Sequence, residues 1–183
     1  MPLPHPLHTA RLLLRPWTPD DAASLHPILV ANWTHLSPWI PARVADPATV
    51  PELVVRLAGC AEDFTSDCAW RYAVIALDDR RILGELALFP RDAAARVELA
   101  RADRVEVGYW LRSDDTGRGF VTEAVAAALD VARGVDRFER AEIHCDPRNA
   151  ASRAVPRRLG FALAGAAAPA ASPLEVWTSA LRP

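Results

Sequence analysis

The segment Glu106-Val-Gly-Tyr-Trp-Leu-Arg-Ser-Asp-Asp-Thr-Gly-Arg-Gly-Phe-Val-Thr-Glu123 decides the fold of this 183-residue chain. Residues 104–111 are typical of a strand, in which Glu106, Gly108 and Trp110 share one face. A loop with two glycines follows and leads directly into a helix. Glycines let the backbone approach a ligand closely, and the unpaired N–H groups at a helix N-terminus favour a phosphate. The segment therefore predicts a strand, a phosphate-binding loop and a helix, although Gly-x-Gly before a helix is also typical of a plain tight turn.

Apolar periodicity and turn residues predict the other elements. Strands are expected at 12–17, 70–77, 82–89, 141–145 and 174–181. One helix is expected to begin at Thr18 and a second at Thr49, a third follows the glycine loop and ends at about Arg133, and a fourth covers 149–159. Residues 32–41 are expected to form a loop, and Pro27 to bend or shorten the first helix. The Ala/Pro/Gly-rich stretch 162–173 carries almost no pattern, so the sequence leaves open whether it is disordered or forms a hairpin. We therefore predict one α+β domain over residues 9–179, after a tail of residues 1–8. Its mixed, mostly antiparallel sheet is flanked by about four helices.

Composition excludes several classes of protein. The formal net charge is −2, so there is no basic excess for nucleic acid or anionic lipid. All 21 basic residues are arginine, which excludes Schiff-base lysine enzymes, P-loop nucleotidases and protein kinases. The three cysteines and five histidines form no cluster at zinc spacing, so no metal site is expected. With neither a signal peptide nor an apolar run of membrane-spanning length, the chain is expected to be soluble and cytoplasmic.

A second segment, His144-Cys-Asp-Pro-Arg-Asn-Ala-Ala-Ser-Arg-Ala-Val-Pro-Arg-Arg-Leu-Gly-Phe161, ends one strand and enters the next helix. Together the two segments resemble the GNAT superfamily of acyl-CoA-dependent N-acetyltransferases, in its RimJ/RimL branch. In that family R/Q-x-x-G-x-G/A binds a pyrophosphate, and N-x-x-S-x-x-V-x-x-x-L-G-F follows the next strand. The opening residues Thr9 to Trp17 and the stretch His-Leu-Ser-Pro-Trp-Ile-Pro at 35–41 match the same branch. The resemblance implies the GNAT fold and acetyl-CoA as co-substrate.

The resemblance assigns the cofactor contacts to Trp110, Leu111, Arg112, Thr116, Gly117, Arg118, Gly119, Phe120, Thr122, Asn149, Ser152 and Arg158. One feature departs from the family, because Asp114, Asp115 and Thr116 replace the arginine or glutamine before the first glycine. Two acids would repel a pyrophosphate, so both are expected to point to solvent, with Arg112 or Arg118 supplying the positive charge.

The implied reaction is direct attack of a neutral amine on a thioester. The resemblance makes Glu106 the general base, acting through a water; the alternative is an ion-paired strand glutamate. The Ser152 hydroxyl is the expected proton donor to the leaving thiolate, with Tyr109 as a lower-ranked rival, and a backbone N–H near Trp110 or Leu111 would hold the thioester oxygen. For Asn149 and Ser152 the alternative is helix capping.

The remaining expectations concern the acceptor and its pocket. Trp33, His35 and Trp39 would line an acceptor pocket, or only pack in the core. His144 is expected to be a surface histidine of its strand and Cys145 a core thiol. The expected activity is acetyl transfer to a primary amine, first a protein N-terminal α-amine, by a possible homodimer with no nucleic-acid or membrane partner. The alternatives are a small-molecule amine acetyltransferase and a non-catalytic acyl-CoA-binding module.

Overall fold

Eight strands form one sheet in the computed structural model, which describes residues 3, 5–167 and 174–182. The strands are β1 (Leu7–His8), β2 (Leu12–Pro16), β3 (Trp70–Ala76), β4 (Ile82–Arg91), β5 (Arg104–Leu111), β6 (Arg140–Cys145), β7 (Ala162–Ala167) and β8 (Leu174–Ala180). The α-helices are α1 (Ala22–Leu36), α2 (Ala42–Ala45), α3 (Val50–Thr65), α4 (Phe120–Arg133) and α5 (Ala150–Arg158), and three short 3-10 turns accompany them. The α+β class and the mostly antiparallel sheet are as expected from the sequence.

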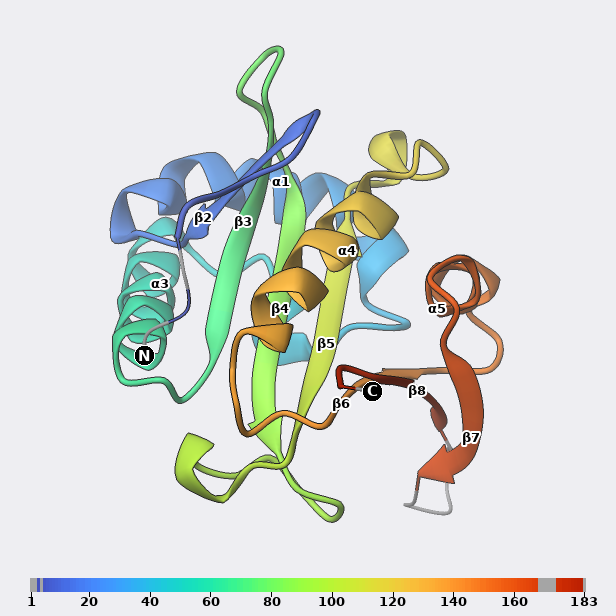
Figure 1. The fold of residues 1–183 in the computed structure, drawn as a ribbon. Coiled ribbons are helices and arrows are strands. Elements are labelled where there is room, and N and C mark those ends of the chain that lie inside the picture. Colours follow the sequence, from blue (N-terminus) through green and yellow to red (C-terminus); the bar gives the residue numbers. More distant parts are fainter. Residues whose placement is uncertain (1–2, 4, 168–173, 183) are drawn as a thin grey trace.

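The strand order is β1-β2-β3-β4-β5-β6-β8-β7, and β5 and β6 are the one parallel pair among the described strands. Their pairing covers only residues 104–106 of β5 and 140–142 of β6. Figure 1 shows β6, with β8 and β7 beyond it, turning away from the long strands β3, β4 and β5. The sheet is therefore opened at its centre, next to the end of β5.

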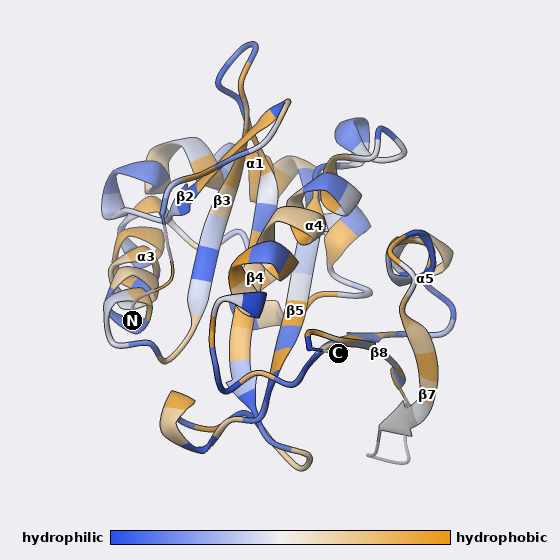
Figure 2. Cartoon of the chain, viewed as in Figure 1, coloured by the Kyte–Doolittle hydropathy of each residue, from blue (hydrophilic) through white to orange (hydrophobic). Residues whose placement is uncertain are grey.

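The helices cover the two faces of the sheet unequally. Helix α4 crosses one face in front of β4 and β5 (Figure 1) and packs there through residues such as Val125 and Leu129. Helices α1 and α3 pack on the opposite face, around Trp17 and Leu53. Figure 2 shows polar and apolar residues interspersed along the central strands, yet β3 and β4 are almost entirely buried because helices cover both faces of the sheet.

Helix α1 corrects the prediction for its region. The helix continues past Pro27 to Leu36, so it includes the first five residues of the expected loop. A proline inside a helix removes one backbone hydrogen bond and costs about 3 kcal/mol. Leu25, Leu29 and Leu36 are buried along this helix, and burying each leucine contributes roughly 1.5–3 kcal/mol. Packing therefore outweighs the local penalty.

For residues 162–167 the structure decides between the two alternatives, disorder and a hairpin, that the sequence leaves open. Residues Ala162–Ala167 form β7, which pairs with β8, while 168–173 lie outside the described residues. Alanine and glycine carry no strand signal of their own, so the pairing with β8 decides the conformation. No described helix is both long and apolar enough to cross a membrane.

A close backbone contact holds β4 and β5 together near the site. A Cβ added to Gly84 of β4 would lie 2.0 Å from the carbonyl oxygen of Trp110 in β5. No side chain fits at that distance, so only glycine allows the two strands to approach in this way.

We expect Gly84→Ala to lower the free energy of unfolding by about 1–3 kcal/mol, because the new methyl group forces the strands apart. Urea unfolding monitored by circular dichroism measures the change. Gly59→Ala in helix α3 is the matched control, since an added Cβ there has open space, and alanine in a helix interior stabilises by roughly 0.5–1 kcal/mol relative to glycine. Equal stability of Gly84→Ala and the parent would contradict the steric argument.

Candidate active site

A cavity of about 490 Å³ lies where β5 and β6 separate. It is lined by the end of β5, the first turn of α4, the end of β6 and the start of α5, and by residues after α1. The β5–β6 pairing stops at Glu106 and Glu142. The Arg112 N–H donates to the Leu83 carbonyl of β4. Successive N–H groups along a strand point to opposite sides, so the N–H of Leu111 points away from β4 and toward the gap.

The loop before α4 presents a row of backbone donors to this cavity. Gly117 and Gly119 have φ values of 73° and 81°, which favour glycine, and Gly119 is the N-cap of α4. The backbone N–H groups of residues 117–122 make no hydrogen bond with the rest of the described chain. With the positive end of the helix dipole, they form a site for a phosphate or pyrophosphate.

The two acids in the loop behave differently from each other. The Asp114 side chain is 80% exposed, as expected. Asp115 contradicts the prediction, because its side chain is only 2% exposed and contacts Arg81 (3.3 Å), Arg118 (3.2 Å) and Arg112 (3.7 Å). The three guanidinium groups therefore neutralise the buried carboxylate. Because Arg81 also pairs with Asp79 and Arg112 lies 3.9 Å from Asp114, these arginines leave no excess charge for a phosphate, and the backbone N–H groups are the donors of the loop.

Contacts from distant segments fix the position of this loop. Glu123 in the first turn of α4 accepts hydrogen bonds from Thr9 Oγ1 (2.6 Å) and from Arg11 Nε (2.7 Å). Asn32 of α1 accepts a hydrogen bond of 2.8 Å from the Ser113 N–H. The roles of Arg11 and Asn32 were not predicted, because neither lies in the motif that binds the ligand.

Asn149 and Ser152 lie on the other side of the gap. Asn149 caps α5, since its Oδ1 accepts a hydrogen bond of 3.0 Å from the Ser152 N–H, and both residues also line the cavity. The Ser152 hydroxyl donates to the Tyr109 oxygen (3.3 Å), and the Tyr109 hydroxyl donates to the Ser152 carbonyl (3.0 Å). Burial raises the pKa of Tyr109, so its proton stays on the oxygen at neutral pH. The two rival proton donors are therefore neighbours.

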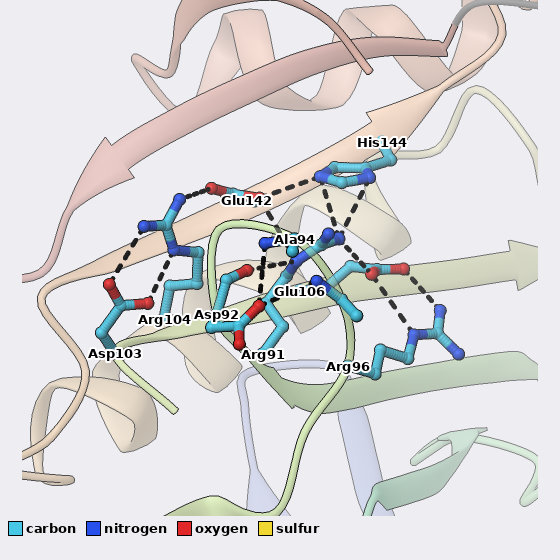
Figure 3. Close-up of polar contacts among 10 residues, drawn as sticks. Arg91, Asp92, Ala94, Arg96, Asp103, Arg104, Glu106, Glu142 and His144 are labelled. Atoms are coloured by element: carbon cyan, nitrogen blue, oxygen red, sulfur yellow. Dashed lines mark hydrogen bonds and ion pairs between the residues drawn. The ribbon is translucent and has the colours of Figure 1, made fainter. Parts of the chain in front are cut away.

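Glu106 is the centre of an ion-pair network on the opposite face of β5 (Figure 3). Its carboxylate contacts Arg91 Nη1 at 2.7 Å and Arg96 Nη2 at 2.5 Å. Burial by itself raises the pKa of Glu106, but the hydrogen bond and charge of Arg96, with nearby His144 and Arg91, outweigh burial and hold the pKa below its usual value. The carboxylate is thus ionised and tightly held.

A second buried carboxylate lies further along the same face. Glu85 of β4, opposite Trp110, contacts Arg71 at 2.7 Å and accepts a hydrogen bond of 2.9 Å from Trp17 Nε1. Burial raises the pKa of Glu85, and Arg71 only partly offsets it. Glu85 lines the cavity. No sequence motif indicated this residue.

The cavity contains most, but not all, of the predicted site residues. Its lining includes Glu106, Trp110, Leu111, Thr116, Gly117, Gly119, Phe120, Thr122, Asn149, Ser152, Arg158, His35 and Trp39. Trp33, Arg112 and Arg118 do not line it. Trp33 lies on α1 because the helix extends through the expected loop. The two arginines instead contact Asp115. Cys145 is buried as expected, whereas His144 is mostly buried and lines the cavity rather than the surface.

Fold and site together define an acyltransferase-type architecture, with a phosphate-binding helix N-terminus beside separated strands. The sequence matches the family described as "Acetyltransferase (GNAT) domain" over residues 11–162. The chain therefore belongs to this family of acetyltransferases.

Individual relatives agree with this family. Two proteins of Bacillus subtilis (strain 168) are each 27% identical. "Putative ribosomal N-acetyltransferase YdaF" matches over 84% of this chain and 76% of its own length. "Probable N-acetyltransferase YjcK" matches over 65% of this chain and only 62% of its own length, less than two thirds. A solved structure of RimL, the ribosomal L7/L12 alpha-N-protein acetyltransferase, in complex with coenzyme A superposes with a TM-score of 0.79 at 20% identity, covering 94% of this chain and 95% of RimL. At that identity the likeness establishes the fold alone.

We expect Asp115→Asn to lower the free energy of unfolding by about 1–3 kcal/mol, because a neutral amide at this buried position loses the charge that three guanidinium groups contact. Thermal and urea unfolding measure the change. Asp114→Asn is the matched control, because its side chain is exposed, and we expect it to unfold like the parent. If the two variants were equally stable, the buried cluster would not hold the loop.

Proposed function

We propose that this protein transfers an acetyl group from acetyl-CoA to a primary amine, first of all the α-amine of a protein N-terminus. One observation carries the proposal: the free N–H groups of residues 117–122 and the gap between β5 and β6 border the same cavity. The N–H groups suit a pyrophosphate, and the gap provides room for an extended pantetheine beside a backbone donor.

The residues present fit coenzyme A. The donors at the start of α4 suit the pyrophosphate, and Arg158 on the lining suits another phosphate, whereas Arg157 lies over the Trp177 ring. Asn149, Val155 and Ile143 line the path between them and the gap. When bound, acetyl-CoA supplies the thioester whose carbonyl carbon is attacked.

The reaction needs two proton transfers, one to the leaving thiolate and one from the amine, and the side chains for them lie on opposite faces of β5. The N–H of Leu111 is the proposed donor to the thioester oxygen. On the α4 face, the Ser152–Tyr109 hydroxyl pair is proposed to protonate the leaving thiolate. On the other face, Glu106 is the proposed base that receives a proton of the amine through a water. Because its pKa is lowered, the carboxylate holds that water in place more readily than it retains a proton.

The choice of a protein N-terminus rests on two considerations. The relatives YdaF and RimL are named as ribosomal and alpha-N-protein acetyltransferases. An α-amine has a reference pKa near 7.7–8.0 against about 10.4 for lysine, so more of it is neutral at physiological pH. His35 and Trp39 are proposed to line the acceptor end of the cavity. A small-molecule amine is the second candidate, and the homodimer and the cytoplasmic location also remain predictions.

We expect calorimetric titration to give saturable one-site binding of acetyl-CoA but none of NADPH. ATP serves as a second control, because it shares the adenine and phosphates but not the pantetheine. Thiol release from acetyl-CoA is then measured with a peptide bearing the L7/L12 N-terminus, its N-terminally blocked form and simple amines. Turnover of the free but not the blocked peptide supports the proposal. Binding without turnover on any amine would leave a non-catalytic acyl-CoA-binding module, and absence of binding would overturn both.

We expect Glu106→Gln to lower kcat by about 10²–10⁴-fold, since general-base catalysis contributes in that range. Affinity for acetyl-CoA should stay within about twofold, because the carboxylate lies on the face of β5 away from α4. Steady-state kinetics and calorimetry measure the two effects. Glu98→Gln is the control, because Glu98 is exposed and outside the cavity lining. Unchanged turnover in Glu106→Gln would remove Glu106 from the reaction.

A further inference from the structure

We propose that His144 is the final acceptor of the amine proton, with Glu142 as the residue that positions it. This inference rests on the proposed acetyl transfer and adds a catalytic residue to it. His144 lines the cavity, its side chain is 11% exposed, and its Nε2 lies 2.9 Å from Glu142 Oε2 (Figure 3). A histidine oriented by a carboxylate is a common arrangement for proton transfer in enzymes.

The position of His144 follows from the register of the separated strands. The last paired rung joins Glu106 to Glu142, and His144 comes two residues later on the same face of β6. At the same level on β5 lies Gly108, whose lack of a side chain leaves room over that strand; an added Cβ would meet only Phe89, at 3.5 Å. His144 is thus placed where the strands have parted, whereas Glu106 is placed where they still pair.

The hydrogen bonds define which nitrogen can accept a proton. Because the Glu142 carboxylate accepts, Nε2 carries the hydrogen and Nδ1 has the lone pair. Arg91 Nη1 is 3.3 Å from both ring nitrogens. An equal distance places Nη1 over the face of the ring, since an equidistant position in the ring plane would overlap Cε1. The one donor near Nδ1 among the described residues is Arg91 Nη1, and its position over the ring face leaves the in-plane lone pair of Nδ1 available for a proton.

The charges around the imidazole act in opposite directions, because Glu142 at 2.9 Å favours a positive charge on the ring and Arg91 at 3.3 Å opposes it. From β4 comes Arg91, from β5 Glu106 and from β6 Glu142. Arg104 of β5 holds the second oxygen of Glu142 at 2.8 Å. Glu106 shares its charge between two arginines, while Glu142 presents one oxygen to His144. The neighbour of His144 on β8 is Val176, which is uncharged. Because Arg91 is itself paired with Glu106 at 2.7 Å, part of its charge is compensated, and Glu142 is the carboxylate that stabilises a protonated His144 directly.

The proton balance is as follows. The amine nitrogen forms the C–N bond, and the C–S electron pair leaves with sulfur. Glu106 draws one N–H proton from the amine through its water, and the water passes the proton on to His144 Nδ1, so that the carboxylate and the water are both regenerated. The Ser152–Tyr109 pair donates a proton to the thiolate and regains one from solvent. The imidazolium then loses its proton to solvent before the next cycle.

The test compares His144→Gln with Glu142→Gln, using the acceptor that the wild-type enzyme acetylates fastest. We expect His144→Gln to lower kcat by about 10²-fold or more and Glu142→Gln by about tenfold, with acetyl-CoA affinity unchanged. The pH profile separates catalysis from a structural role. In the wild type, log(kcat/KM) falls at acid pH with a slope of two, because both the amine and the imidazole must be neutral. In His144→Gln the slope becomes one, whereas Glu106→Gln keeps a slope of two.

His8→Gln is the control, since His8 is exposed on β1 and outside the cavity lining, and it should behave as the wild type. Added imidazole should restore part of the activity of His144→Ala, which a purely structural histidine would not allow. Wild-type kcat/KM and slope in His144→Gln would overturn the inference while leaving acetyl transfer intact. A wild-type enzyme that binds acetyl-CoA but acetylates no amine would instead overturn the proposed function, and this inference with it.

Discussion

The short parallel pairing between β5 and β6 is the constraint on which the rest of the site depends. Three residues on each strand pair, and beyond Glu106 and Glu142 the strands separate. Separation leaves N–H groups of β5 without a strand partner, which costs free energy unless a ligand or water satisfies them. It also opens the cavity and brings the first turn of α4 and the cap of α5 to opposite sides of one space. Binding and chemistry share this gap.

Arginine alone supplies the positive charge in and around the gap. Asp115 is enclosed by three guanidinium groups, and Glu106 is held by two. A planar guanidinium with several donors can contact two carboxylates at once, as Arg91 does with Glu106 and Glu142. The result is a set of fixed, ionised carboxylates. His144 differs in kind from these neighbours, because a neutral imidazole has a ring nitrogen that can accept a proton, whereas a guanidinium has none.

Sequence patterns predicted the elements with strong local signals. The strands β3, β4 and β5 and the helix that begins after Thr49 all occur where apolar alternation or cap residues indicate them. The wrong prediction and the undecided segment lie where tertiary contacts outweigh local preference. Helix α1 passes Pro27 because its leucines are buried, and β7 forms because β8 offers a free edge. Neither cause is visible within a short window of sequence.

The sequence by itself determined the family, the α+β class, the glycine loop at α4 and most of the cavity lining, because these depend on residue types at fixed spacing along one strand, loop or helix. Only the tertiary structure decided the charge state and partners of the carboxylates. Asp115 is buried rather than exposed, Glu106 is doubly ion-paired, and His144 meets Glu142 and Arg91 inside the cavity. The contacts of Glu106 and His144 join β4, β5 and β6, and the longest connects residues 53 positions apart. Electrostatic interactions depend on distance in space, so separation along the chain does not reveal them.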